Sequence, residues 1–231
     1  MSNELYNLDT PPDNFLYTIH LSQLMISIGS VAKGFPTFNE GSNLNFDCIA
    51  VFKNALQCVL AVLERLSAVF IVRDAARFTY QRMVGCIGLD ILPFLPILIT
   101  SGLLSASSLK EICDFLNFIS LIVHKFKPAI LPVLDQLFLT LIERIFNILN
   151  QQPSGTDEMI ACMELRKSYL NFLAAIFNND LEDILTSDLN RPHLTMVMQS
   201  VIHCANDSGD PGSQKLAFSV LGKMITAWGG G

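Results

Sequence analysis

The chain has 231 residues, of which 51% are hydrophobic and only 16% are charged. This composition excludes intrinsic disorder, which needs low hydrophobicity and high charge. The formal net charge is −6, so the chain is not cationic overall and any contact with nucleic acid must come from a local patch. The charged fraction is below the roughly 25% that is usual for soluble domains. We therefore expect the apolar surface to be covered by a membrane, a large core or neighbouring protein.

A membrane span needs about 20 mostly apolar residues. The most apolar stretch, residues 84–102, contains Asp90, Pro93 and Pro96, and its clean apolar run is too short to span. The first residues also lack the basic and apolar regions of a secretory signal. We predict that the chain does not insert into a membrane.

The six cysteines form no CxxC pair, and most fall inside apolar helical patterns. This arrangement favours buried free thiols in a reducing compartment over disulfides. The six are Cys48, Cys58, Cys86, Cys113, Cys162 and Cys204.

The hydrophobic residues repeat with a helical period along almost the whole chain, and no run shows the sustained alternation of a strand. Breaks rich in Gly, Pro, Ser and Asn divide the chain into helices. In chain order, the helices are predicted at 14–33, 45–67, 72–87, 91–100, 109–126, 129–150, 157–178, 191–206 and 213–228.

Three sequence signals mark helix starts. Ser108 with Glu111 has the spacing of a capping box, and Ser154 with Asp157 is a second candidate. Asp210 before a proline is typical of an N-cap followed by proline at the first helical position.

The predicted helices pair, with units that begin near 45, 108, 157 and 212, at a spacing of about 50 to 60 residues. The centre of helix 45–67 has almost no polar face, so it needs cover on several sides, which stacked helix pairs provide. We predict an all-α fold, an α-solenoid (superhelix) of HEAT-type antiparallel helix pairs. Residues 1–231 would form a single segment of about four to five repeats of a longer chain, because polar capping repeats are missing. Alone, we expect the segment to aggregate or dimerise.

No catalytic motif is present, and the histidines have no partners at a recurring metal-ligand spacing. We predict that the chain is not an enzyme and holds neither cofactor nor metal. A carboxylate group on a predicted turn is either a solvated loop or an acidic docking surface. It comprises Asp180, Glu182, Asp183 and Asp188.

A helical wheel places Arg73, Arg77, Tyr80 and Gln81 within about 100° of one another. Such a face can contact phosphates and stack on a base. The alternative is a solvated face with local pairing, for example through Asp74.

Three further cations lie beyond this helix. Arg166 falls on the apolar side of helix 157–178, which favours a buried structural pair over RNA contact. Lys167 points outward, and Lys215 lies in the first turn of the last helix beside an acidic loop. Together with Arg73, Arg77, Tyr80 and Gln81, we take Lys167 and Lys215 as candidate RNA-binding residues.

Several segments of the chain resemble the exportin-T family of nuclear export receptors for tRNA. The specific ones are FIVRDAARFTYQRMVGCIGLDILPFLPILI at 70–99 and SGDPGSQKLAFSVLGKMITAWG at 208–229, with GSVAKGFP at 29–36 and LRKSYLNFL at 165–173. The resemblance runs, with gaps, across most of the chain. It implies a segment from the C-terminal half of an importin-β-like karyopherin.

The resemblance implies a carrier that binds tRNA together with Ran-GTP in the nucleus, passes the pore through contacts with nuclear pore proteins, and releases tRNA in the cytoplasm after GTP hydrolysis on Ran. It also implies shuttling between nucleus and cytoplasm. The N-terminal repeats, which in importin-β-like proteins hold Ran most strongly, are absent here. The alternative function is a HEAT-repeat protein-binding scaffold or a protein-cargo karyopherin without RNA binding. On the export hypothesis, Arg73→Glu with Arg77→Glu should weaken tRNA binding without unfolding the protein.

Overall fold

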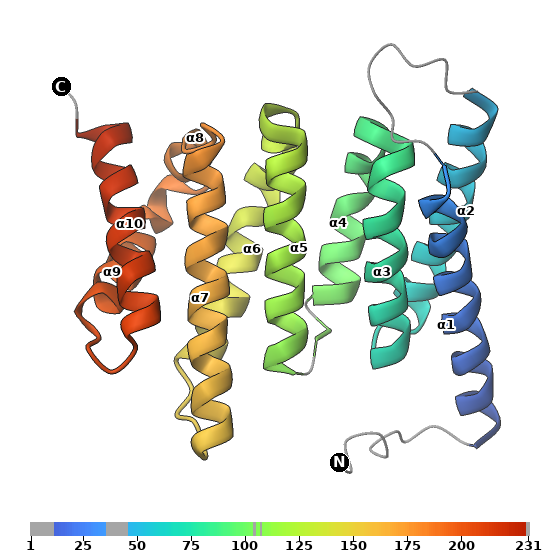
Figure 1. The fold of residues 1–231 in the computed structure, drawn as a ribbon, viewed down its shortest axis with the longest axis horizontal. Helices are drawn as coiled ribbons and strands as arrows, with labels where there is room; N and C mark the ends of the chain where they lie inside the picture. Colours follow the sequence, from blue (N-terminus) through green and yellow to red (C-terminus); the bar gives the residue numbers. More distant parts are fainter. Residues whose placement is uncertain (1–11, 36–45, 104, 107, 230–231) are drawn as a thin grey trace. The chain divides into compact units, whose positions relative to one another are not determined.

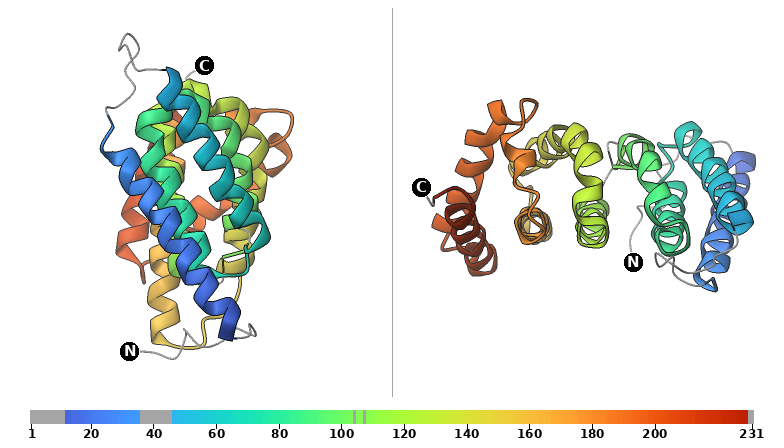
Figure 2. Two further views of the ribbon diagram at one scale, coloured as in Figure 1. Left: turned by 90° about the vertical axis from the view of Figure 1, so that its right-hand side faces the viewer. Right: turned by 90° about the horizontal axis from the view of Figure 1, so that it is seen from above.

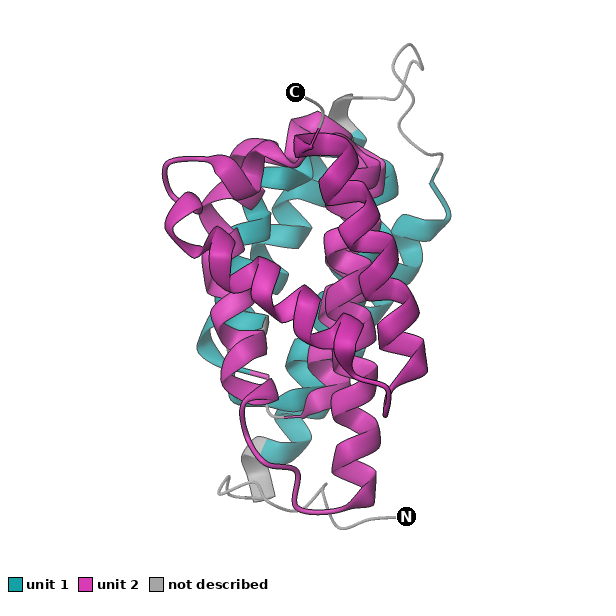
Figure 3. Cartoon of the chain, turned by 90° about the vertical axis from the view of Figure 1, so that its left-hand side faces the viewer, with its two compact units in different colours: residues 1–105 teal, residues 106–231 magenta. Residues whose placement is uncertain are grey.

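The computed structural model describes residues 12–35, 46–103, 105–106 and 108–229. Every regular element in these ranges is helical, which confirms the all-α prediction. The chain forms two compact units, residues 1–105 and 106–231 (Figure 3). Each unit is described by itself, and the single solenoid segment over 1–231 stays a prediction.

Unit 1 is built around one helix, α3, which packs against both α1 and α2 (Figure 1). After α3 the backbone continues through short turns of different helical types. The elements are α1 (Pro12–Lys33), α2 (Phe46–Arg65), α3 (Phe70–Ile87), the 3-10 helix η2 (Gly88–Phe94), α4 (Leu95–Ile97) and the π-helical η3 (Leu98–Leu103).

Helices α1 and α3 approach closely because α1 presents small side chains to α3. A Cβ atom on Gly29 would lie 2.9 Å from the Cα atom of Thr79, too close for any larger residue without a shift. The hydroxyl of Thr79 donates a hydrogen bond of 2.6 Å to the carbonyl of Met25 across the same contact. The GSVAKGFP segment therefore begins at a close contact between α1 and α3.

The predicted helix 91–100 is wrong in type. Pro93 lies inside η2 and Pro96 lies in the first turn of α4. Because proline lacks an amide hydrogen and clashes with the preceding turn, the chain here passes from 3-10 through α to π geometry.

By length and composition, two helical stretches are apolar enough to cross a membrane: Phe15–Lys33 and Phe70–Gly102. This corrects the expectation that no apolar stretch is long enough. More than half of the second stretch is buried inside the protein, and core helices of water-soluble proteins pass the same test. The absence of membrane insertion stays a prediction.

Unit 2 has two layers of helices (Figures 1 and 2). Helix α7 lies between α5 and α10 and packs against both, while α6 and α9 form the second layer. The elements are α5 (Leu109–Phe126), η4 (Lys127–Ile130), α6 (Leu131–Leu149), α7 (Thr156–Asn178), α8 (Asp183–Thr186), η5 (Arg191–His193), α9 (Leu194–Asn206) and α10 (Pro211–Trp228). The short α8 was not predicted, because four residues are too few to show a period.

Aromatic contacts hold α7 to its neighbours on both sides. Phe138 of α6 stacks on Phe172 at 6.2 Å between ring centroids. Phe177 meets Trp228 of α10 edge to face at 5.4 Å. Offset and edge-to-face pairs contribute about 0.5–1.5 kcal/mol each beyond the area that they bury.

The helix starts test the three capping predictions. The Ser108 side chain accepts a hydrogen bond from the amide of Glu111, which confirms Ser108 as the N-cap of α5. The Asp210 carboxylate accepts one from the amide of Ser213, which confirms the predicted N-cap of α10. The pairing of Ser154 with Asp157 is wrong. Helix α7 begins at Thr156, which turns Glu158 instead back toward Ser154.

All six cysteines are free thiols, as predicted. Cys86, Cys162 and Cys204 are buried, whereas Cys58 is exposed, so the prediction of burial is wrong for Cys58. Burial raises the pKa of the Cys162 and Cys204 thiols.

Candidate nucleic-acid interface

The face predicted from the wheel of α3 is turned inward at two of its four positions. Arg73 is only 1% exposed, and its guanidinium donates a hydrogen bond of 2.7 Å to the carbonyl of Ser67. Tyr80 is fully buried, and its hydroxyl donates to the carbonyl of Ile91 at 2.8 Å. Burial raises the pKa of Tyr80 well above its usual value. The prediction that Arg73 and Tyr80 lie on an exposed face is therefore wrong.

The other two positions on this face reach solvent. Arg77 is partly buried and pairs with Asp74 at 2.5 Å, which is the local pairing that the sequence offered as the alternative. Gln81 is exposed one turn further along α3. Arg82, which the sequence analysis did not single out, is also exposed, and its guanidinium lies 5.0 Å from the centre of the Phe78 ring.

In unit 2 the structure brings Lys167 and Lys215 to one place. The Lys167 side chain crosses the first turn of α10, where a Cβ atom on Gly212 would lie 2.9 Å from its Cε atom. Lys215 follows Gly212 by one helical turn and is exposed. We call Arg166, Lys167 and Lys215 the α7–α10 cluster.

Carboxylates lie close to the α7–α10 cluster. The ammonium of Lys167 donates to Glu164 at 2.8 Å, and this bond raises the pKa of Lys167, so the side chain is cationic throughout the neutral range. Arg166 pairs with Asp207 at 3.1 Å, with both side chains partly exposed. The predicted structural pair of Arg166 is thus confirmed, although it is not fully buried. A phosphate approaching Lys167 must compete with Glu164.

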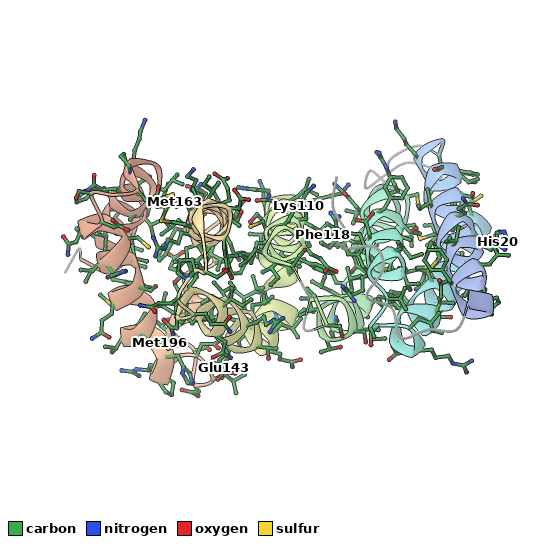
Figure 4. All side chains as sticks on the ribbon, turned by 90° about the horizontal axis from the view of Figure 1, so that it is seen from below. His20, Lys110, Phe118, Glu143, Met163 and Met196 are labelled. Atoms are coloured by element: carbon green, nitrogen blue, oxygen red, sulfur yellow. The ribbon has the colours of Figure 1, made fainter. Side chains whose placement is uncertain are left out.

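A groove of about 490 Å³ lies between α6 and α9, above α7. Its floor includes Tyr169, whose hydroxyl shares a hydrogen bond of 2.7 Å with Ser200. Glu143 and Met196 line its two sides (Figure 4). The sequence did not reveal this groove, because its residues come from three helices and share no motif.

The carboxylates around α8 lie on a turn of unit 2. Asp180, Asp183 and Asp188 are exposed. This placement fits a solvated loop and equally leaves the surface open to a basic partner, so both alternatives stay predictions. Within the described residues, no group of three or more His, Cys, Asp or Glu side chains is placed to hold a metal ion.

Comparison with known proteins gives the family. The family model described as Exportin-T matches residues 1–231. The chain belongs to the Exportin-T family. This membership confirms the resemblance seen in the sequence and, with the paired helices, the predicted karyopherin solenoid of HEAT-type repeats.

Curated proteins named Exportin-T are similar to this chain. The relative from Mycosarcoma maydis is 36% identical over 220 residues, which are 95% of this chain and 20% of that protein. The one from Aspergillus fumigatus is 36% identical over 211 residues, 89% of this chain and 20% of that protein. The one from Emericella nidulans is 35% identical over 212 residues, 89% of this chain and 21% of that protein. The chain therefore spans about a fifth of the length of these Exportin-T relatives.

Proposed function

We propose that this chain is a segment of a nuclear export receptor for tRNA, which binds tRNA together with Ran-GTP in the nucleus and releases it in the cytoplasm after GTP hydrolysis on Ran. The observation that carries this proposal is the match of the Exportin-T family to the whole chain. The receptor is a carrier and not an enzyme. It shuttles between nucleus and cytoplasm and contacts nuclear pore proteins on the way.

Its mechanism is thermodynamic coupling. A solenoid converts small rotations at each repeat into a large change of curvature. If tRNA and Ran-GTP each favour the same curvature, each raises the affinity for the other by the same factor. In this account, residues 1–231 are one solenoid segment of four to five repeats, and Ran is held mainly by repeats outside it.

Within this segment, Lys167 and Lys215 are the first candidates for phosphate contacts. Lys167 and Lys215 lie on adjoining helices and are reachable from solvent. Gln81 and Arg77 form a second candidate contact on α3. Proteins recognise folded RNA largely through its backbone and shape, which suits lysines that address phosphates without reading bases.

The test uses the complete protein from the same gene and labelled tRNA, at several salt concentrations. Lys167→Glu with Lys215→Glu should weaken tRNA binding by about 10-fold and lower the salt slope by about 2, because two phosphate contacts are lost. Lys110→Glu with Lys125→Glu makes the same charge change at opposite ends of α5 and should leave the affinity within about 2-fold. An unchanged affinity and an unchanged slope in the first variant would refute the assignment of these contacts.

A protein-binding HEAT scaffold is the second candidate function. The observation that favours it is the pairing of Arg166 and Lys167 with Asp207 and Glu164, which reduces the positive potential that RNA requires. Copurification separates the two functions. RNA that remains with the complete protein through purification supports the export receptor, and its absence in low salt supports the scaffold.

A further inference from the structure

The groove between α6 and α9, which we call the α6–α9 groove, has a lining that the proposed export function does not use. Its walls and floor come from consecutive helix pairs inside unit 2. In a solenoid each repeat contacts only the repeats before and after it, so the neighbours in the stack lie beside this groove and not over it. Its volume of about 490 Å³ is within the range of ligand pockets, roughly 300–1,000 Å³.

The two walls of the groove carry rows of polar side chains. Glu143, Asn147 and Asn150 follow one another at one-turn spacing along α6 and its C-cap, and Gln199 and His203 do so along α9. All five are exposed, and within the part of the chain that the structure describes their side chains have no protein partner. Seven residues of α-helix rise about 10 Å, which is the length of about three residues of extended chain.

The charge of the groove favours a cation. The guanidinium of Arg166 is paired with Asp207 at 3.1 Å. Arg144, the neighbour of Glu143 in the sequence, donates to the carbonyl of Ala106 at 2.6 Å. Glu143 has no ion pair among the described residues, so the uncompensated charge in the groove is negative. Such a site attracts a basic group and repels a phosphate.

The floor of the groove suits an alkyl chain better than a base. Phe146 and Tyr169 pack edge to face at 5.5 Å between ring centroids, and Tyr169 is only 1% exposed. Little ring face is therefore open for the stacking by which proteins hold single-stranded nucleic acid. The stem of a lysine or arginine packs on apolar surface while its charged head stays in water. Here the stem would lie on Phe146 and the head would reach Glu143.

We propose that the α6–α9 groove binds an extended peptide of a protein partner, with a lysine or arginine of that peptide opposite Glu143. The side-chain amides of Asn147, Asn150 and Gln199 each offer donors and an acceptor, which match the N–H and C=O groups of an extended backbone. Backbone hydrogen bonds supply affinity in this kind of recognition, and the side-chain contact supplies specificity. The inference goes beyond the proposed export function and does not depend on tRNA binding.

The test selects peptides from a displayed library of random nonapeptides on the immobilised complete protein. The selected peptides should share a lysine or arginine at one position. A synthetic copy of one of them should bind with a Kd on the order of 10–100 µM in fluorescence polarisation. Glu143→Gln keeps the size of the side chain and removes its charge, and it should raise this Kd about 10-fold.

Glu64→Gln is the matched control, because it makes the same change at an exposed position on α2. It should leave the Kd within about 2-fold. Since Glu143 is exposed as well, both variants should keep the Tm of the wild-type protein.

A second measurement locates the peptide without any substitution in the protein. A benzophenone next to the basic residue of the selected peptide should cross-link to Met196, which is 36% exposed and lines the wall opposite Glu143 (Figure 4). Met159, which does not line the groove, is the internal control, because at 46% exposed it would react more often in random collisions.

Four results would overturn the proposal. They are a library that yields no shared basic residue, a Kd that Glu143→Gln leaves unchanged, and cross-linking to Met159 without Met196. The fourth is a single-stranded RNA hexamer that competes with the peptide and binds more tightly to Glu143→Gln, because the groove would then be a nucleic-acid site.

Discussion

The burial of Arg73 leads to a prediction opposite to that drawn from the sequence. Charge reversal at an exposed phosphate contact lowers RNA affinity and leaves the fold intact. Arg73, however, is 1% exposed and donates to the carbonyl of Ser67. Arg73→Glu removes a charge-assisted hydrogen bond, and this loss lowers the free energy of unfolding by about 1.5–3 kcal/mol. It also buries a carboxylate beside the carbonyl that the guanidinium contacted. We expect a total loss of about 3–5 kcal/mol in the free energy of unfolding, as for other broken buried pairs.

Arg82→Glu is the matched control, because it makes the same charge change on the same helix at an exposed position. Among the described residues, the Arg82 guanidinium contacts the Phe78 ring, and the loss of this contact costs about 0.5–1 kcal/mol. Urea unfolding followed by circular dichroism measures both variants, and thermal melts should show Arg73→Glu lowered by roughly 10 °C. If the two variants unfold within about 1 kcal/mol of each other, Arg73 does not support unit 1 and our reasoning is refuted.

Three further predictions follow from local geometry. Gly29→Ala should destabilise unit 1 by about 1–3 kcal/mol through overpacking against α3. Gly222→Ala should instead stabilise α10 by about 0.4–1 kcal/mol, because a Cβ atom at this position has no neighbour within 4 Å. Urea midpoints that move in the same direction for both variants would contradict this contrast. Cys58 should alkylate first and Cys86, the least exposed cysteine at 2%, last, as peptide mass spectrometry would show. Equal rates would count against the described burial. Hydrogen bonds from Ser154 lower the pKa of Glu158. The contribution of the ionised carboxylate to folding stability is therefore present in full above the usual carboxyl pKa, and it is lost as pH falls through the lowered value. Glu158→Gln should therefore flatten the acid limb of a plot of Tm against pH, and an unaltered limb would show that this bond does not form.

The helices were predictable because their signals are local. The amphipathic period and the caps at Ser108 and Asp210 placed the ends of α5 and α10 within two residues of those observed. The start of helix α7 was predicted one residue too late, at 157 and not at Thr156. For this reason Glu158, and not Asp157, is the carboxylate that faces back toward Ser154. Prolines 93 and 96 also signalled an interruption, but sequence alone does not say that the chain continues through 3-10 and π turns.

The candidate site was less predictable, because a helical wheel gives the angles between residues and not which face is covered. Arg73 and Tyr80 do share a face with Gln81, but α3 packs against both α1 and α2, so most of its circumference is buried. The proximity of Lys167 to the first turn of α10 could not be predicted either. It depends on how α7 and α10 pack, and the only sequence trace of it is the glycine at 212.

The measurement that tests the central claim most directly is the affinity of the complete protein for labelled tRNA, near about 0.1 M salt, with and without Ran-GTP. The account predicts that Ran-GTP raises the affinity for tRNA, and that tRNA raises the affinity for Ran-GTP by the same factor. Absence of tRNA binding in both conditions would contradict the account and return this Exportin-T family segment to the class of protein-binding scaffolds.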